Sequence, residues 1–203
     1  MNEQERARHR KRLRRFHDPG DFHELTFSCY RRMPLLTNDD WRQRLSRHIR
    51  NACVAQDVDL VAFVYMPEHI HLLIYLRSNS PRIGRFLASF KSPFSAEIKS
   101  LLVRRGSRLI EKLTIRERPG KEVFRFWQEG AGYDRNIHSE DALKACIGYI
   151  HSNPVRRGLA DHCVDWSWSS ARYYLLDPPQ QQFDELPNMH GLPTGAFERT
   201  DSR

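Results

Sequence analysis

Two histidines separated by one residue, His69 and His71, lie in the apolar segment VYMPEHIHLLIYL at residues 64–76. In a β-strand, residues i and i+2 project from the same face, so these imidazoles would stand together with Cα atoms about 6–7 Å apart. That spacing allows both rings to bind one divalent cation. Two ligands do not complete a metal site, and the alternative is a pair of polar residues that face solvent.

A tyrosine and an asparagine four residues apart, Tyr149 and Asn153, lie in the helical pattern SEDALKACIGYIHSN. Residues at i and i+4 share one face of a helix, and Tyr149 would flank the apolar stripe. From there a phenol could reach the edge of a packed sheet. The alternatives are a boundary tyrosine that packs its ring and an asparagine that caps the helix before Pro154.

The elements that must position these side chains alternate between strand and helix periodicity. The strand-like segments are residues 22–30, 59–66 and 70–76, with a strand or short hairpin within 121–137 around Gly130 and Gly132; the helical segments are residues 37–56, a stretch opening after Ser80, and residues 139–153. The turn PEH would join the second and third strands as an antiparallel hairpin. We expect Pro93 to interrupt or kink the middle helix and Pro154 to end the last one.

This order predicts an α+β fold of the ferredoxin-like, split βαβ type. We expect a four-stranded, mostly antiparallel sheet with helices on one face, followed by a helical or irregular C-terminal extension. The expected parts are a basic arm at residues 1–20, one domain at 21–176 and an irregular tail at 177–203.

The composition favours a polyanion as partner. The 203 residues carry 33 Lys and Arg against 25 Asp and Glu, a formal charge of +8, and the pI is about 9.6. Such an excess attracts nucleic acid. The four cysteines form no CxxC pair, which argues against a thiolate zinc site and a disulfide framework. Neither a secretory signal nor a membrane-spanning run is present, so we expect a cytoplasmic protein.

Two motifs together resemble a known family. YMPEHIHLLIYL, followed about eighty residues later by GYIHSNPVRRGLADHCVDWSWSSARYY, resembles the single-tyrosine HUH transposases with an IS200-like domain, and in particular the REP-associated tyrosine transposases. The lead-in FWQEGAGYDRNIHSEDALKACIGYIHSNP also follows the family pattern. The resemblance covers roughly residues 20 to 175, so the domain at 21–176 is expected to be a single-tyrosine HUH transposase domain.

The resemblance implies a role for each motif residue. His69, His71 and Asn153 would hold Mg²⁺ or Mn²⁺, and Tyr149 would be the nucleophile that forms a 5′-phosphotyrosyl intermediate and frees a 3′-OH. Tyr133 is the alternative nucleophile, although it has no amide partner four residues on. No small-molecule cofactor is expected.

Basic residues would contact DNA through its phosphates. The expected contacts lie in the N-terminal arm, in the basic block 82–118 and just after the tyrosine helix: Arg10, Arg12, Arg14, Arg15, Arg82, Arg85, Lys91, Arg156 and Arg157. The aromatic residues of DWSWSSARYY could stack on bases or cover the core as a docked segment.

We therefore expect a metal-dependent single-strand DNA endonuclease and strand-transferase acting on hairpin-forming, REP-like DNA near the nucleoid. The family also suggests a monomer, because its helix-exchanging dimers are the shorter relatives. The alternatives are a domesticated, non-cleaving DNA-binding protein of the same fold and an RNA-binding ferredoxin-like module, which would call for exposed aromatic residues on the central strands.

Overall fold

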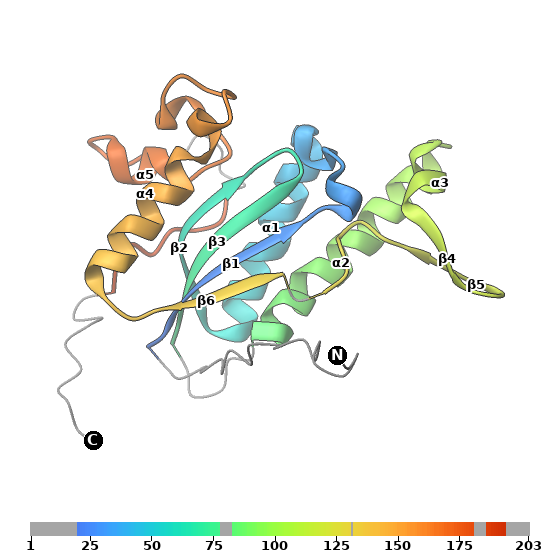
Figure 1. Ribbon diagram of the computed structural model, residues 1–203, viewed down its shortest axis with the longest axis horizontal. Helices are drawn as coiled ribbons and strands as arrows, with labels where there is room; N and C mark the ends of the chain where they lie inside the picture. Colours follow the sequence, from blue (N-terminus) through green and yellow to red (C-terminus); the bar gives the residue numbers. More distant parts are fainter. Residues whose placement is uncertain (1–19, 78–82, 131, 181–185, 194–203) are drawn as a thin grey trace, which may run out of the picture.

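The histidine-bearing strand β3 (His69–Leu76) is one of the two inner strands of a four-stranded sheet with the order β2-β3-β1-β6 (Figure 1). The computed structural model describes residues 20–77, 83–130, 132–180 and 186–193. The other strands are β1 (Phe22–Ser28), β2 (Val58–Tyr65) and β6 (Tyr133–Ile137). Every neighbouring pair is antiparallel, which confirms the predicted sheet and the β2-β3 hairpin.

The two faces of the sheet carry different helices. The residues Ile70, Leu72 and Ile74 pack, fully buried, in the core with helices α1 (Asp39–Gln56) and α2 (Ile83–Arg104). Leu73, on the opposite face, packs in a second core with helix α4 (Glu140–Arg156). The α+β class is confirmed, but the expectation of helices on one face holds for α1 and α2 and is wrong for α4. Strand alternation buries both faces, and α4 covers the second.

Two prolines lie inside helices, so the expected interruption at Pro93 and the expected end of the last helix at Pro154 are wrong. Proline removes an i to i−4 hydrogen bond and costs about 3 kcal/mol in a helix interior. Pro93 nevertheless lies within α2, where Phe90 and Phe94 are fully buried and their packing offsets that loss. Pro154 is itself buried in the last turn of α4, which continues to Arg156.

The segment that follows α2 leaves the main sheet. Helix α3 (Leu109–Leu113) leads into β4 (Thr114–Arg118) and β5 (Lys121–Phe124), which form a separate two-stranded sheet that projects beside the end of α2 (Figure 1). The segment 121–137 does contain strand structure, and its β6 joins the main sheet, but the hairpin alternative is wrong because β5 and β6 belong to different sheets. Gly132 begins the return to β1 at φ +74, where a Cβ atom would lie 2.3 Å from the Thr26 carbonyl oxygen.

The segment after α4 covers the free edge of β2. The amide of Tyr65 donates to the Trp168 carbonyl at 2.8 Å, and the amide of Ser170 donates to the Phe63 carbonyl at 3.0 Å. Trp168 is buried, so it covers the core as part of a docked segment, which was the alternative to base stacking. A short helix, α5 (Ala171–Leu175), follows, and 3₁₀ turns occupy Tyr30–Arg32, Leu35–Thr37 and Cys163–Asp165.

The rest of the described chain adds no long element. Beyond Asp177, the described residues form neither helix nor strand. Within the described ranges, every helix is too short or too polar to cross a membrane.

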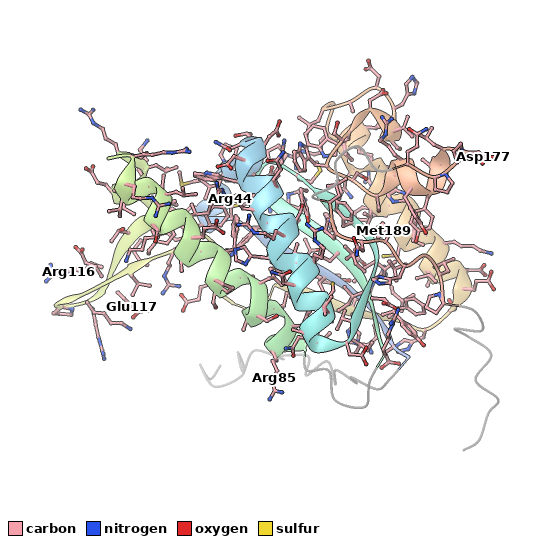
Figure 2. All side chains as sticks on the ribbon, turned by 180° about the vertical axis from the view of Figure 1, so that it is seen from behind. Arg44, Arg85, Arg116, Glu117, Asp177 and Met189 are labelled. Atoms are coloured by element: carbon pink, nitrogen blue, oxygen red, sulfur yellow. The ribbon has the colours of Figure 1, made fainter. Side chains whose placement is uncertain are left out.

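An ion-pair cluster joins α1 to α2 behind the sheet. Glu97 of α2 accepts hydrogen bonds from Arg44, Arg47 and His48 of α1, and Figure 2 shows Arg44 where the two helices lie side by side. Burial alone would raise the pKa of Glu97, but the hydrogen bonds from His48, Arg44 and Arg47 lower it to about 2. The folded state therefore favours the ionised carboxylate.

Replacing Glu97 by glutamine should destabilise the fold by about 1 kcal/mol at pH 7 and by less at pH 3. The carboxylate's contribution is complete above its ordinary pKa of 4.5 and is lost as the pH falls toward its folded pKa of about 2. Urea unfolding of both proteins at the two pH values measures this difference. Asp161→Asn, at an exposed position, is the control, and an equal effect of Glu97→Gln at both pH values would contradict the expectation.

Candidate active site

The imidazoles of His69 and His71 face each other across one residue of β3. Their Nε2 atoms lie 3.1 Å apart, and the rings are nearly perpendicular at 76°. Both side chains are buried on the sheet face that α4 covers in part. Burial, with the neighbouring His69, lowers the pKa of His71 to about 3, and burial also lowers the pKa of His69. Both rings are therefore neutral at pH 7 and offer nitrogen lone pairs.

Each histidine is oriented by a partner at its other nitrogen. His69 Nδ1 donates to Glu68 Oε1 at 3.1 Å, and His71 Nδ1 lies 2.8 Å from Thr26 Oγ1. Thr26 is in place because the register of β1 against β3 sets it opposite His71. Partners of this kind fix the ring and leave Nε2 for a metal. Two nitrogens at right angles around a cation, each about 2.1 Å from it, would be about 3 Å apart, so this pair fits one divalent cation.

Glu68 connects the histidine pair to two arginines. Its Oε1 accepts hydrogen bonds from Arg157 at 2.9 Å and from Arg32 at 3.3 Å. Burial opposes ionisation of Glu68, but the hydrogen bond from Arg157 and the charge of His69 lower its pKa overall. The carboxylate thus joins three segments at the site: the turn after β1, the turn before β3 and the end of α4.

These supporting residues are not among the residues that the sequence motifs predict. Glu68 lies in the predicted PEH turn, where a carboxylate directly before the first histidine is a usable signal. Thr26 and Arg32 carry no such signal, because their contacts depend on which strands pair and in which register.

Helix α4 brings Tyr149 and Asn153 to the histidines. Ser139 caps its start by accepting a hydrogen bond from the Ala142 amide at 3.3 Å, and the buried apolar residues Leu143, Cys146 and Ile150 pack on the sheet. The Tyr149 ring then lies edge-on to His71, with centroids 5.6 Å apart and an interplanar angle of 85°. At 41% exposure its side chain is open to solvent.

Asn153 lies one turn further along the same face. It is buried, and its amide nitrogen donates to the Tyr149 carbonyl at 2.8 Å, which leaves the amide oxygen for another partner. The described parts of the chain hold no cluster of three or more His, Cys, Asp or Glu side chains suited to a metal. Among the described residues, a third ligand at the histidine pair would therefore be a side chain outside these types, and Asn153, which lines the same depression, fits.

Two adjoining depressions meet at His71 and Tyr149. The first, which we call the histidine depression, has a volume of about 390 Å³ and is lined by Thr26, Ser28, Arg32, His69, His71, Tyr149, Asn153, Arg156 and Arg157. The second, the tyrosine depression, measures about 420 Å³ and is lined by Glu24, Thr26, His71, Tyr133, Arg135 and Tyr149. The structure thus brings both candidate nucleophiles, Tyr149 and Tyr133, to one continuous surface.

The predicted DNA contacts divide by location. Arg156 and Arg157 line the histidine depression, and the Arg156 guanidinium lies 5.2 Å from the Tyr149 ring centroid. Arg85 points away from α2 (Figure 2), behind the sheet. Lys91, also on α2, packs with Nζ 4.7 Å from the Phe27 ring centroid. The residues Arg10, Arg12, Arg14, Arg15 and Arg82 lie outside the described residues.

Two known proteins are similar to this chain. A Haemophilus influenzae protein named "Putative REP-associated tyrosine transposase" is 26% identical over 122 residues, which are 60% of this chain and 63% of that protein. The match thus spans less than two thirds of the relative's length. The structure of a REP-associated tyrosine transposase bound to a REP hairpin covers 89% of this chain and 96% of its own, with a TM-score of 0.61 at 20% identity. That likeness confirms the fold.

The family assignment rests on a sequence match over more than half of the chain. The family model described as "Transposase IS200 like" matches residues 21–153, from β1 to the asparagine of α4. The match includes the histidine pair and the tyrosine helix as far as Asn153. The chain therefore belongs to the IS200-like transposase family.

Proposed function

We propose that this chain is a metal-dependent single-strand DNA endonuclease and strand-transferase that acts on hairpin-forming, REP-like DNA. The observation that carries the proposal is the contact of the Tyr149 ring with His71, one of two imidazoles whose Nε2 atoms converge at 3.1 Å. The transposase family supports the reaction class, and the relative solved with a REP hairpin supports the choice of DNA.

His69, His71 and Asn153 would hold Mg²⁺ or Mn²⁺. A cation held there would polarise the scissile phosphate and offset negative charge on the leaving oxygen. Neutral imidazoles and an amide leave the full charge of the cation for the phosphate. Glu68 and Thr26 keep both rings in the orientation that points Nε2 to the cation.

Tyr149 is the nucleophile of the proposed reaction. Its phenolic oxygen forms a bond to phosphorus as the bond from phosphorus to the 3′ oxygen breaks. The phenol loses its proton to solvent, and the 3′ oxygen takes up a proton from solvent. The products are a 5′-phosphotyrosyl link and a free 3′-OH. Because the link keeps the phosphodiester energy, a second 3′-OH can displace the tyrosine without ATP. Arg156 and Arg157 attract the phosphates beside it.

Tyr133 is the alternative nucleophile. It is 53% exposed on β6, pairs across the strands with Thr26 and lines the tyrosine depression. Tyr149 is preferred because its ring contacts His71 and because Asn153 lies on the same helix face. A non-cleaving DNA-binding protein of this fold is the alternative function.

Tyr149→Phe should abolish the covalent adduct with a 3′-labelled hairpin oligonucleotide in Mn²⁺, a loss on the order of 10³-fold or more, because the ring remains and only the attacking oxygen is removed. Denaturing electrophoresis of the labelled protein measures the adduct.

Tyr133→Phe is the matched control and should keep the adduct. An adduct that survives Tyr149→Phe and disappears in Tyr133→Phe would make Tyr133 the nucleophile. If the wild-type protein binds several hairpins and forms an adduct with none, the non-cleaving alternative is correct.

Glu68→Gln should weaken Mn²⁺ binding by roughly 10- to 100-fold, because the amide holds His69 less firmly than the carboxylate does. Isothermal titration of the DNA-free protein with Mn²⁺ measures the affinity. Glu117→Gln, on the projecting hairpin, is the control and should bind like the wild type (Figure 2). Unchanged affinity in Glu68→Gln would remove Glu68 from the cation site.

A further inference from the structure

We propose that the tyrosine depression is a nucleobase subsite that selects guanine next to the scissile phosphate. The position of this subsite next to a scissile phosphate rests on the proposed function. Its selectivity for a base is a separate property of Arg135, Glu24 and Tyr133. These side chains project from β1 and β6 toward α4, beyond the histidine pair.

Arg135 is held in one orientation by a buried carboxylate. Its Nε and Nη2 atoms donate to Glu24 Oε2 at 3.0 and 2.8 Å, and the Glu24 side chain is only 6% exposed. The two residues are directly opposite each other in the β1-β6 register. A guanidinium that binds a carboxylate through its Nε–Nη2 edge keeps a second pair of N–H donors, at Nη1 and Nη2, which point away from the carboxylate.

That outward donor pair matches one base edge. Arginine donates two parallel hydrogen bonds to the O6 and N7 acceptors of guanine, whereas adenine has a donor in place of O6. The Arg135 side chain is 47% exposed and lines the tyrosine depression. A fixed guanidinium loses little side-chain entropy on binding, which favours selective recognition over general attraction to phosphate.

Aromatic rings line the same depression. Tyr133 and Arg135 are two residues apart on β6, so their side chains project from the same face of the sheet. Tyr149 lines the depression from α4. Stacking on a tyrosine ring gives affinity for any base. The rings would therefore bind a base, and the hydrogen bonds from Arg135 would make the binding selective for guanine. A volume of about 420 Å³ suits a nucleotide.

The position of the subsite follows from the shared walls. Thr26, His71 and Tyr149 line both depressions, so a single strand that leaves the histidine pair passes directly into the tyrosine depression. Arg156 and Arg157 line the other end of this path. The selected guanine would therefore be the neighbour of the phosphate that Tyr149 attacks.

Binding tests the subsite without requiring cleavage. We would use the full chain with Tyr149→Phe and fluorescence anisotropy of thymine oligonucleotides of equal length that carry one guanine, adenine or cytosine. The guanine probe should bind at least about fivefold more tightly than the adenine probe. Hypoxanthine, which keeps O6 and N7, should retain the preference, and 7-deazaguanine should lose it.

Matched variants assign the preference to Arg135. Arg135→Lys keeps the charge but not the donor pair, so it should remove the guanine preference and leave binding of the all-thymine probe within about twofold. Arg50→Lys, on helix α1 behind the sheet, should leave the preference intact. Equal affinity for all bases, tight binding of 7-deazaguanine, or a preference that survives Arg135→Lys would each overturn the proposal.

The outcome separates the subsite from the proposed function. A guanine preference in a protein that forms no tyrosine adduct would support the subsite and reject the strand-transferase. An adduct at Tyr149 without any base preference would reject the subsite alone.

Discussion

The antiparallel register between β1 and β3 is the constraint on which the site depends. Strand side chains alternate between faces, so a slip of one residue would move His69 and His71 into the core and bring Ile70 and Leu72 to the site. The packing of the isoleucine and leucine side chains against α1 and α2 opposes that slip. The same register places Thr26 beside His71, so core packing and histidine orientation are set together.

The first and the last turns of helix α4 have different functions. Its first turns carry Leu143 and Cys146, which anchor the helix on the sheet. Its last turns carry Tyr149 and Asn153, which are placed over the histidines by that anchoring. His151, on the opposite side of these turns, lies 2.8 Å from Ser170 Oγ and so ties the helix to the segment that pairs with β2. The position of the tyrosine is therefore fixed from both sides of the helix.

Much of the fold could be predicted because its elements have strong periodicity. The predicted strand at 22–30 is observed at Phe22–Ser28, and the predicted helix at 37–56 at Asp39–Gln56, where Asn38 accepts a hydrogen bond from the Trp41 amide at 3.2 Å. The effect of Pro93 could not be predicted, because local propensity says nothing of the buried phenylalanines that keep α2 intact. The face of the sheet on which α4 packs could not be predicted either, because the apolar stripe of a helix does not specify the surface that it packs against.

The candidate site divides in the same way. His69, His71, Tyr149 and Asn153 could be selected because i+2 and i+4 spacings have fixed geometric meanings in strands and helices. The structure places these four side chains close together, and their chemical roles stay predictions. The residues around them, Thr26, Arg32 and Arg135, could not be selected, because each contact joins segments far apart in sequence. Only the pairing of β1 with β3 and β6 brings them together.

The connection between β6 and α4 has a consequence for how many copies of the chain make one site. Only His138 and Ser139 separate the end of the strand at Ile137 from the start of the helix at Glu140. The three steps from Ile137 to Glu140 span at most about 11 Å, so the start of α4 stays close to the end of its own β6 strand. The tyrosine, the histidines and the amide that line the histidine depression therefore all come from one polypeptide in this structure.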